Sequence, residues 1–186
     1  MLNRSALGFT AVAVALGTLA SACGGAAIAG NAAVCRADDP ANRRTLLVPP
    51  TLGGLRVEAN STATTKLLSA AKGSSTYLCN ALVFALRDGK ELKAVFSVER
   101  LSSDARPTDK EFRDNLVNDI LGTRRKPEKI GDSLVYRGSV NDQVISVWFN
   151  DRFLELLFVR EDQANAGVVD ETRILVEALS LQPVDI

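Results

Sequence analysis

The chain between residues 77 and 101 alternates apolar runs with turn-forming residues, a pattern typical of strands joined by a hairpin. Strand-forming residues fill Tyr77 to Leu86 and Leu92 to Leu101. Between them, Asp88-Gly89 favours the positive backbone dihedrals of a tight turn. The pattern therefore predicts an antiparallel hairpin over these residues.

Further strands are predicted on both sides of this hairpin. A short apolar run from Leu46 to Val48 is stopped by Pro49-Pro50, and Gly53-Gly54 turns the chain into a brief strand at Leu55 to Glu58. Three more strands are expected at Ile130 to Gly138, Gln143 to Phe149 and Phe153 to Arg160, with turns at Asn141-Asp142 and Asn150-Asp151. The last two runs are apolar almost throughout, so we expect them to lie at the centre of the sheet with both faces covered.

Three helices are predicted from periodicity and capping signals. The first starts at Asn60 or Ser61 and ends at Gly73, with Leu67, Leu68 and Ala71 on one face. The second follows the capping box Thr108-Asp109-Lys110-Glu111, buries Phe112, Leu116, Val117, Ile120 and Leu121, and stops at Gly122. The third runs near Val168 to Leu179, with a stripe of Ile174, Leu175, Ala178 and Leu179.

These elements predict a single α+β domain. Hairpin-joined strands form a mostly antiparallel sheet, which we expect to have about five to six strands covered by about three helices. The order of the elements and the Leu-rich closing strand and helix resemble the Mog1/PsbP-like fold over roughly residues 46 to 181. This resemblance implies a fold and says little about function.

The N-terminal residues have the layout of an export signal. Arg4 precedes Ala6 to Leu19, an uncharged run of 14 residues, which is shorter than the roughly 20 residues needed to span a hydrocarbon core. Leu19-Ala20-Ser21-Ala22-Cys23 resembles the lipobox of bacterial lipoproteins of the actinobacterial type. The resemblance implies cleavage before Cys23, a diacylglyceryl group on its thiol, and anchoring to the outer face of the cell membrane. The alternative is an ordinary signal peptide with an incidental Cys23.

The resulting organisation is a signal peptide at residues 1–22, a lipidated N-terminus and flexible tether at 23–45, and one domain at 46–186. The residues that follow Cys23, GGAAIAGNAA, are small and cannot form a core of their own. The membrane, reached through the lipid, is thus the first expected partner.

Composition narrows the chemistry that the domain can perform. The chain has no histidine, which removes the commonest general base and metal ligand. With Cys23 lipidated, two cysteines cannot form a zinc or iron–sulfur cage, so no metal or cofactor is expected. Lys plus Arg and Asp plus Glu both number 22, and this balance gives no reason to expect a nucleic acid partner.

Carboxylates remain as possible catalytic groups. The adjacent pairs Asp38-Asp39, Glu161-Asp162 and Asp170-Glu171 are interpreted as solvated turns or helix starts. Glu155 stands out as an acid inside an apolar strand. We expect it at a sheet edge or paired with an arginine, the alternative being a functional group with a raised pKa.

The remaining two cysteines, Cys35 and Cys79, form an even pair in an exported protein, which predicts a disulfide between them. The alternative is one exposed thiol on the tether and one buried thiol. Trp148 is interpreted as a core residue rather than a binding platform.

The loop Arg124 to Lys129 is the one charged cluster that invites a functional interpretation. It is expected to be solvated, with contact to anionic lipid headgroups as the alternative.

The sequence as a whole favours a non-catalytic binding or accessory module at the cell envelope. A carrier of a lipid or small apolar ligand is the second hypothesis, because the lining of an apolar cavity looks like ordinary core in a sequence. An enzyme that uses carboxylates is the third.

Overall fold

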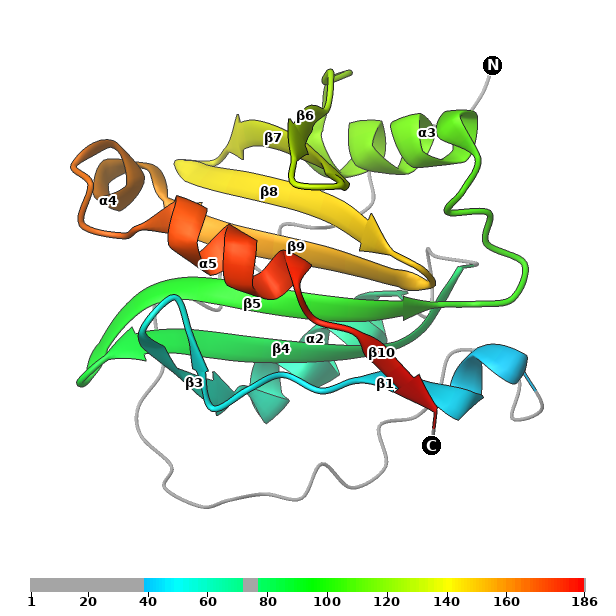
Figure 1. The fold of residues 1–186 in the computed structure, drawn as a ribbon, viewed down its shortest axis with the longest axis horizontal. Helices are drawn as coiled ribbons and strands as arrows, with labels where there is room; N and C mark the ends of the chain where they lie inside the picture. The colour runs from blue at the N-terminus through cyan, green and yellow to red at the C-terminus, as the bar shows by residue number, and fades with distance from the viewer. Residues whose placement is uncertain (1–38, 72–76, 186) are drawn as a thin grey trace.

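The computed structural model describes residues 39–71 and 77–185, and these form one α+β domain (Figure 1). Its strands are β1 (Arg44–Leu46), β2 (Thr51–Leu52), β3 (Leu55–Ala59), β4 (Leu78–Asp88), β5 (Glu91–Leu101), β6 (Glu128–Ile130), β7 (Ser133–Val140), β8 (Gln143–Asn150), β9 (Phe153–Arg160) and β10 (Pro183–Asp185). Its helices are the 3₁₀-helix η2 (Pro40–Arg43) and the α-helices α2 (Ser61–Ala71), α3 (Lys110–Leu121), α4 (Glu161–Asn165) and α5 (Glu171–Leu179).

One eight-stranded sheet forms the body of the domain, in the order β2-β3-β4-β5-β9-β8-β7-β6. All of its neighbouring strands pair antiparallel. The hairpin of β4 and β5 and the central placement of β8 and β9 are confirmed. The pairing of β5 with β9 joins the two halves of the sheet, although about fifty residues separate these strands in the chain.

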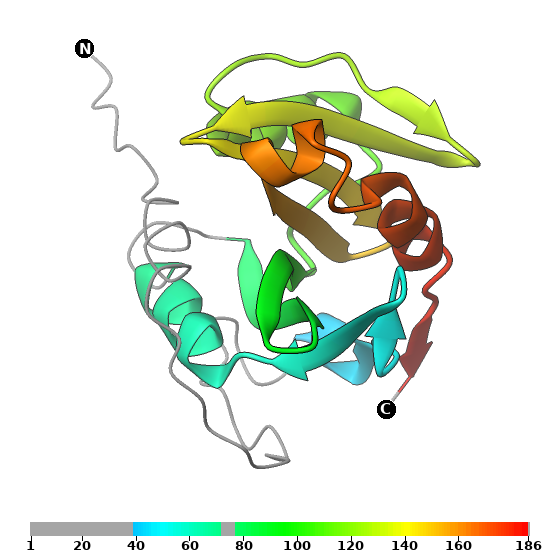
Figure 2. The same ribbon diagram turned by 90° about the vertical axis from the view of Figure 1, so that its left-hand side faces the viewer.

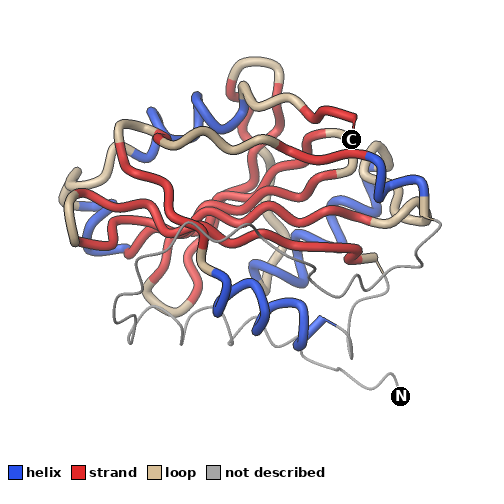
Figure 3. The backbone as a smooth tube through the Cα atoms, turned by 90° about the horizontal axis from the view of Figure 1, so that it is seen from below, coloured by secondary structure: helices blue, strands red, loops and turns tan. Residues whose placement is uncertain are grey.

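The sheet is covered on both faces, because strand residues alternate between two hydrophobic cores. One core packs against α2 and α3, through residues such as Leu67, Leu68, Val117 and Leu121. The other packs against α5, through Ile174, Leu175 and Ala178. Figure 3 shows the strands as a red layer with blue helices on either side.

The three predicted helices are present, and the structure corrects some of their boundaries; the predicted end of the first helix at Gly73 lies outside the described residues. The side chain of Asn60 accepts a hydrogen bond from the Ala63 amide and caps α2. The N-cap of α3 is Asp109 and not Thr108, because the carboxylate of Asp109 reaches the amides of Glu111 and Phe112 at 2.7 and 3.2 Å. At its other end α3 stops at Gly122, which adopts φ 70° as expected for a C-cap glycine.

The closing helix begins later than predicted. Asp170 caps α5 by accepting a hydrogen bond from the Arg173 amide at 3.0 Å, and Val169 before it packs into the core. The separate short helix α4 was not predicted. It starts at Glu161-Asp162, one of the acidic pairs interpreted as a helix start.

The sheet has more strands than the five to six expected, because short edge strands carry little sequence signal. The pairs β2–β3 and β6–β7 involve only two and three residue pairs, respectively. Three residues of β10, with a proline among them, pair with β1 as a separate two-stranded sheet. Arg44 and Thr45 of β1, assigned in the sequence to the tether, are therefore part of the folded domain.

Candidate functional site

Glu155 is the acid, among the described residues, that has both carboxyl oxygens buried without a hydrogen bond of normal geometry. It lies in β9 at the centre of the sheet and is fully buried. Opposite it on β8 lies Trp148, which is buried and stacks on Phe96 with ring centroids 6.0 Å apart. Among the described residues, neither carboxyl oxygen of Glu155 makes a hydrogen bond of normal geometry, and the indole NH of Trp148 makes none either.

Burial decides the protonation of this group. Loss of solvent raises the pKa of Glu155 to about 8, and the side chains of Asn150 and Trp148 offset only part of that effect. The expectation that Glu155 lies at an edge or pairs with an arginine is wrong. Since β9 lies between β5 and β8, the side chain enters a core and remains a neutral acid at neutral pH.

A second buried carboxyl, Glu99, lies in the neighbouring strand β5. It is 5% exposed, and burial raises its pKa to about 7 while a 3.5 Å hydrogen bond from the Ser97 hydroxyl opposes the shift. Glu99 was not among the site residues predicted from the sequence. Its signal was available, because Glu99 stands between Val98 and Leu101 in a predicted strand, but the adjacent Arg100 made the position look exposed.

Glu99 and Glu155 are close in the sheet but cannot act on one substrate. In the ladder of β5 and β9, Val98 is opposite Glu155 and Leu154 is opposite Glu99. Side chains of directly opposed residues lie on the same face, and consecutive residues lie on opposite faces. Glu155 therefore enters the core under α5, whereas Glu99 enters the core under α2 and α3. The two acids are separated by the backbone of the sheet, so they are not the carboxylate pair that a glycosidase requires.

A third buried acid, Glu171, is fully paired and holds α5 to the sheet. Its two carboxylate oxygens accept hydrogen bonds from the Arg137 guanidinium of β7 at 2.5 Å and from the Ser146 hydroxyl of β8 at 2.7 Å. Its position in the first turn of α5 also suits a negative charge at a helix N-terminus. This arrangement is a structural bridge.

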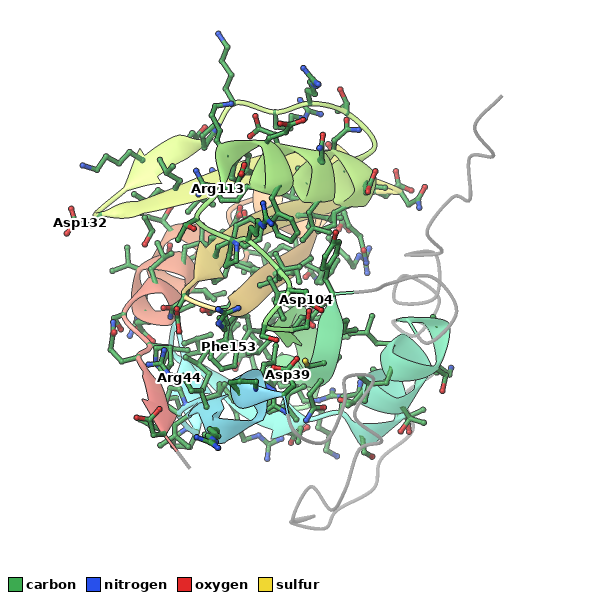
Figure 4. All side chains as sticks on the ribbon, turned by 90° about the vertical axis from the view of Figure 1, so that its right-hand side faces the viewer. Asp39, Arg44, Asp104, Arg113, Asp132 and Phe153 are labelled. Atoms are coloured by element: carbon green, nitrogen blue, oxygen red, sulfur yellow. The ribbon has the colours of Figure 1, made fainter. Side chains whose placement is uncertain are left out.

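A polar cluster at one end of the sheet surrounds Arg100. The guanidinium donates to the carbonyl of Arg44 at 3.0 Å and is attracted by the charge of Asp39. Burial lowers the pKa of Arg100, and the nearby carboxylate partly reverses this. Figure 4 labels Asp39 and Arg44 in this region, together with Phe153, the residue opposite Arg100 in the sheet.

Asp39 corrects the expectation that its acidic pair is solvated. It is 8% exposed, and Oδ2 accepts hydrogen bonds from both the amide and the hydroxyl of Ser103 at 3.2 Å. The same oxygen lies 3.9 Å from Sγ of Cys79. The start of the described chain is thereby fixed to the loop that follows β5.

The predicted modification sites are only partly covered by the structure. Cys79 is fully buried at the start of β4. Cys23 and Cys35 lie outside the described residues, so the lipidation and the Cys35–Cys79 disulfide stay predictions.

The other two predicted features are placed by the structure. Trp148 is a core residue, as expected. Arg124 to Lys129 joins α3 to β7, with each residue exposed, and its last two residues form the start of β6 rather than loop.

No helix within residues 39–71 and 77–185 is both long and apolar enough to cross a membrane. The same residues contain no group of three or more Cys, Asp or Glu side chains arranged to hold a metal ion.

No protein-family model, curated protein or solved structure matches this chain. The resemblances to bacterial lipoproteins and to the Mog1/PsbP-like fold therefore rest on the residues alone.

Proposed function

We propose that this chain is an exported lipoprotein, anchored to the outer face of the cell membrane through Cys23, whose domain is a non-catalytic binding or accessory module of the cell envelope. The anchor is supported by the lipobox-like residues Leu19 to Cys23 after an uncharged run. Two acyl chains on one residue suffice for durable attachment, whereas a single chain binds only marginally.

The observation that carries the non-catalytic assignment is the placement of Glu99 and Glu155 on opposite faces of one sheet. Without histidine, buried carboxyls are the chain's natural candidates for general acid–base chemistry. Each of the two faces a separate hydrophobic core, and the third buried acid, Glu171, is engaged by Arg137 and Ser146. The acidic groups that remain in the described domain lie nearer its surface. We therefore propose that the domain acts by binding through surface contacts.

Mass spectrometry of the protein from its own host tests the anchor. The mature N-terminal peptide should begin at Cys23 and carry the mass of a diacylglyceryl group, and a Cys23→Ser variant should lack that mass. An unmodified Cys23 in a mature chain that begins elsewhere would show that the protein is not a lipoprotein.

Native mass spectrometry after mild cross-linking in the membrane tests the role of the domain. A protein neighbour cross-linked to the domain is the expected result. A retained mass of lipid size would instead support a carrier of apolar ligands, and a reaction that depends on Glu155 would replace both assignments with an enzyme.

A further inference from the structure

The loop after α3 and the strand it leads into present a row of exposed basic side chains. Four basic residues, Arg124, Arg125, Lys126 and Lys129, are exposed within six positions of the chain. Among the described residues, the first three have no carboxylate within ion-pair distance. We call these four residues the basic edge, because they lie just before or within β6, the outer strand of the sheet.

Within the described part of the chain, the two acidic residues nearby leave Arg124, Arg125 and Lys126 unpaired, and only Lys129 of the basic edge has a carboxylate at ion-pair distance. Glu128 has its carboxylate 4.0 Å from the guanidinium of Arg137, and Asp132 has its carboxylate 4.0 Å from the ammonium of Lys129. Figure 4 shows Asp132 at the outer end of the β6–β7 hairpin. The basic edge as a whole is therefore net positive, although the complete chain is neutral.

The fold fixes the backbone at both ends of the loop and holds the side chain of Arg125. Gly122 ends α3 in the left-handed conformation, and β6 pairs with β7 from Glu128 onward, so both ends of the loop are fixed. Between them, Nε of Arg125 lies 3.2 Å from the position that a Cβ on Gly138 would occupy, which places this side chain against β7. A side chain held in this way, on a loop fixed at both ends, loses less conformational freedom on binding than one on a mobile tail.

An exposed apolar residue beside the basic edge indicates what kind of partner this surface binds. Leu134 is 42% exposed and lies directly opposite Lys129 in the pairing of β6 with β7. Exposed cations next to an exposed apolar side chain suit the interface of an anionic bilayer, where headgroups meet the charges and the apolar group enters the acyl boundary. We infer that the basic edge and Leu134 form a surface that contacts the anionic lipid membrane to which the chain is anchored.

This inference rests on the proposed lipid anchor, and the chain is long enough to allow it. In both Figure 1 and Figure 2, η2 lies at the opposite end of the molecule from β6. Fifteen residues, Gly24 to Asp38, separate the anchor from the described domain. An extended chain spans up to about 3.6 Å per residue, or about 54 Å here, and about 40 Å over the eleven residues Gly24 to Val34 that stay free when Cys35 is bonded to Cys79. A domain of this size measures roughly 40 Å across, so the tether allows its far end to turn toward the same membrane.

Vesicle binding by the unlipidated mature chain tests the inference independently of the anchor. The chain from residue 23 onward, carrying Cys23→Ser, is sedimented with vesicles of phosphatidylcholine alone and with an equimolar mixture of phosphatidylcholine and phosphatidylglycerol. Binding should be confined to the mixture and weaken with added salt. The double variant Arg124→Gln/Lys126→Gln should bind on the order of 25-fold more weakly, from about fivefold per basic residue.

A matched variant separates this surface from overall charge. Lys66→Gln/Lys90→Gln removes two exposed cations from α2 and from the β4–β5 turn, and its binding should stay within about twofold of the parent. An equal loss in both double variants would overturn the inference. Equal binding to vesicles with and without phosphatidylglycerol would also overturn it. So would a chain that binds poly-glutamate through Arg124 and Lys126 but does not bind the vesicles.

The failure of this inference and the failure of the anchor are distinguishable. The vesicle experiment uses a chain without acyl groups, whereas the anchor is read from the mass of the Cys23 peptide. Vesicle binding with an unmodified Cys23 would leave the basic edge as the membrane contact of a secreted protein and would contradict only the anchor.

Discussion

At the scale of single residues, the domain keeps two carboxyls out of water on either side of one sheet. Glu155 is fully buried and Glu99 is 5% exposed. Burial of a carboxyl is tolerated at neutral pH when the group takes up a proton, because the neutral acid costs far less to desolvate than the anion. Both groups therefore link the stability of the fold to pH.

The stability of the domain should fall as the pH rises from about 5 to about 8. Burial raises the pKa of Glu99 to about 7 and that of Glu155 to about 8, from 4.5. Between these values the folded state holds protons that the unfolded state has released, so unfolding becomes more favourable with each pH unit, on the order of 1 kcal/mol per group. The chain has no histidine, so no imidazole titrates between about pH 5 and pH 8 and adds its own pH dependence to the stability. Urea unfolding at a series of pH values measures the slope.

The variant Glu155→Gln should flatten this slope and stabilise the protein most at the alkaline end. The same change at the exposed Glu111 should leave the slope as it is. A parent protein whose stability rises from pH 5 to pH 8 would contradict the assignment of Glu155 as a buried neutral acid.

At the scale of elements, α5 is held to the sheet at several points along its length. Glu171 binds Arg137 and Ser146 at its start. Farther along, the carboxylate of Glu177 accepts a hydrogen bond from the amide of Gly53 at 2.5 Å, in the turn between β2 and β3. The backbone of this turn comes so close to α5 that only glycine fits.

Gly53→Ala should destabilise the domain by about 2–4 kcal/mol. A Cβ at this position would lie 3.1 Å from both the backbone N and Cα of Ile174, and φ is +60°, so a side chain there meets both a clash and an unfavourable backbone conformation. The matched change is Gly89→Ala, where φ is +56° and no atom lies within 4 Å of the added Cβ. That variant should lose only the cost of backbone strain, about 1 kcal/mol. Equal unfolding midpoints in urea for the two variants would mean that α5 does not press on the turn.

At the scale of the whole molecule, one sheet separates two cores, and its outer parts are secured by short strands and by the ends of the chain. The pairing of β1 with β10 ties the beginning of the described domain to its end. Asp39 is tied to Ser103 just before that pairing. A link from the N-terminal segment to the start of β4 would extend this pattern, and Cys79 is the residue placed to make it.

The disulfide between Cys35 and Cys79 remains a prediction, and it should stabilise the exported protein. The bond would close a loop of 45 residues, counted from Cys35 to Cys79, which contributes up to about 4 kcal/mol on the chain-entropy estimate. Non-reducing peptide mapping should recover the two cysteines in one linked peptide, and reduction should lower the melting temperature. Alkylation of both thiols in the exported, unreduced protein would contradict the pairing.

The sequence by itself determined the elements whose signals are local. The hairpin of β4 and β5 follows from strand formers around a turn, and α3 follows from a cap at each end and one apolar face. The near-continuous apolar runs of β8 and β9 also predicted their central place in the sheet. A strand buried on both faces has apolar residues at nearly every position, and not only at alternate positions.

Only the tertiary structure decided which elements meet and what environment each polar residue receives. Short strands such as β6 and β10 form because a neighbouring strand has unpaired backbone groups with which they can make hydrogen bonds. A segment of three residues is too short for its hydrophobic pattern to predict a strand. Glu99 and Glu155 are both acids within predicted strands, and nothing in the sequence shows which face of the sheet each one enters. The register of β5 with β9, a contact between distant parts of the chain, places them in different cores and so decides that they cannot share a site.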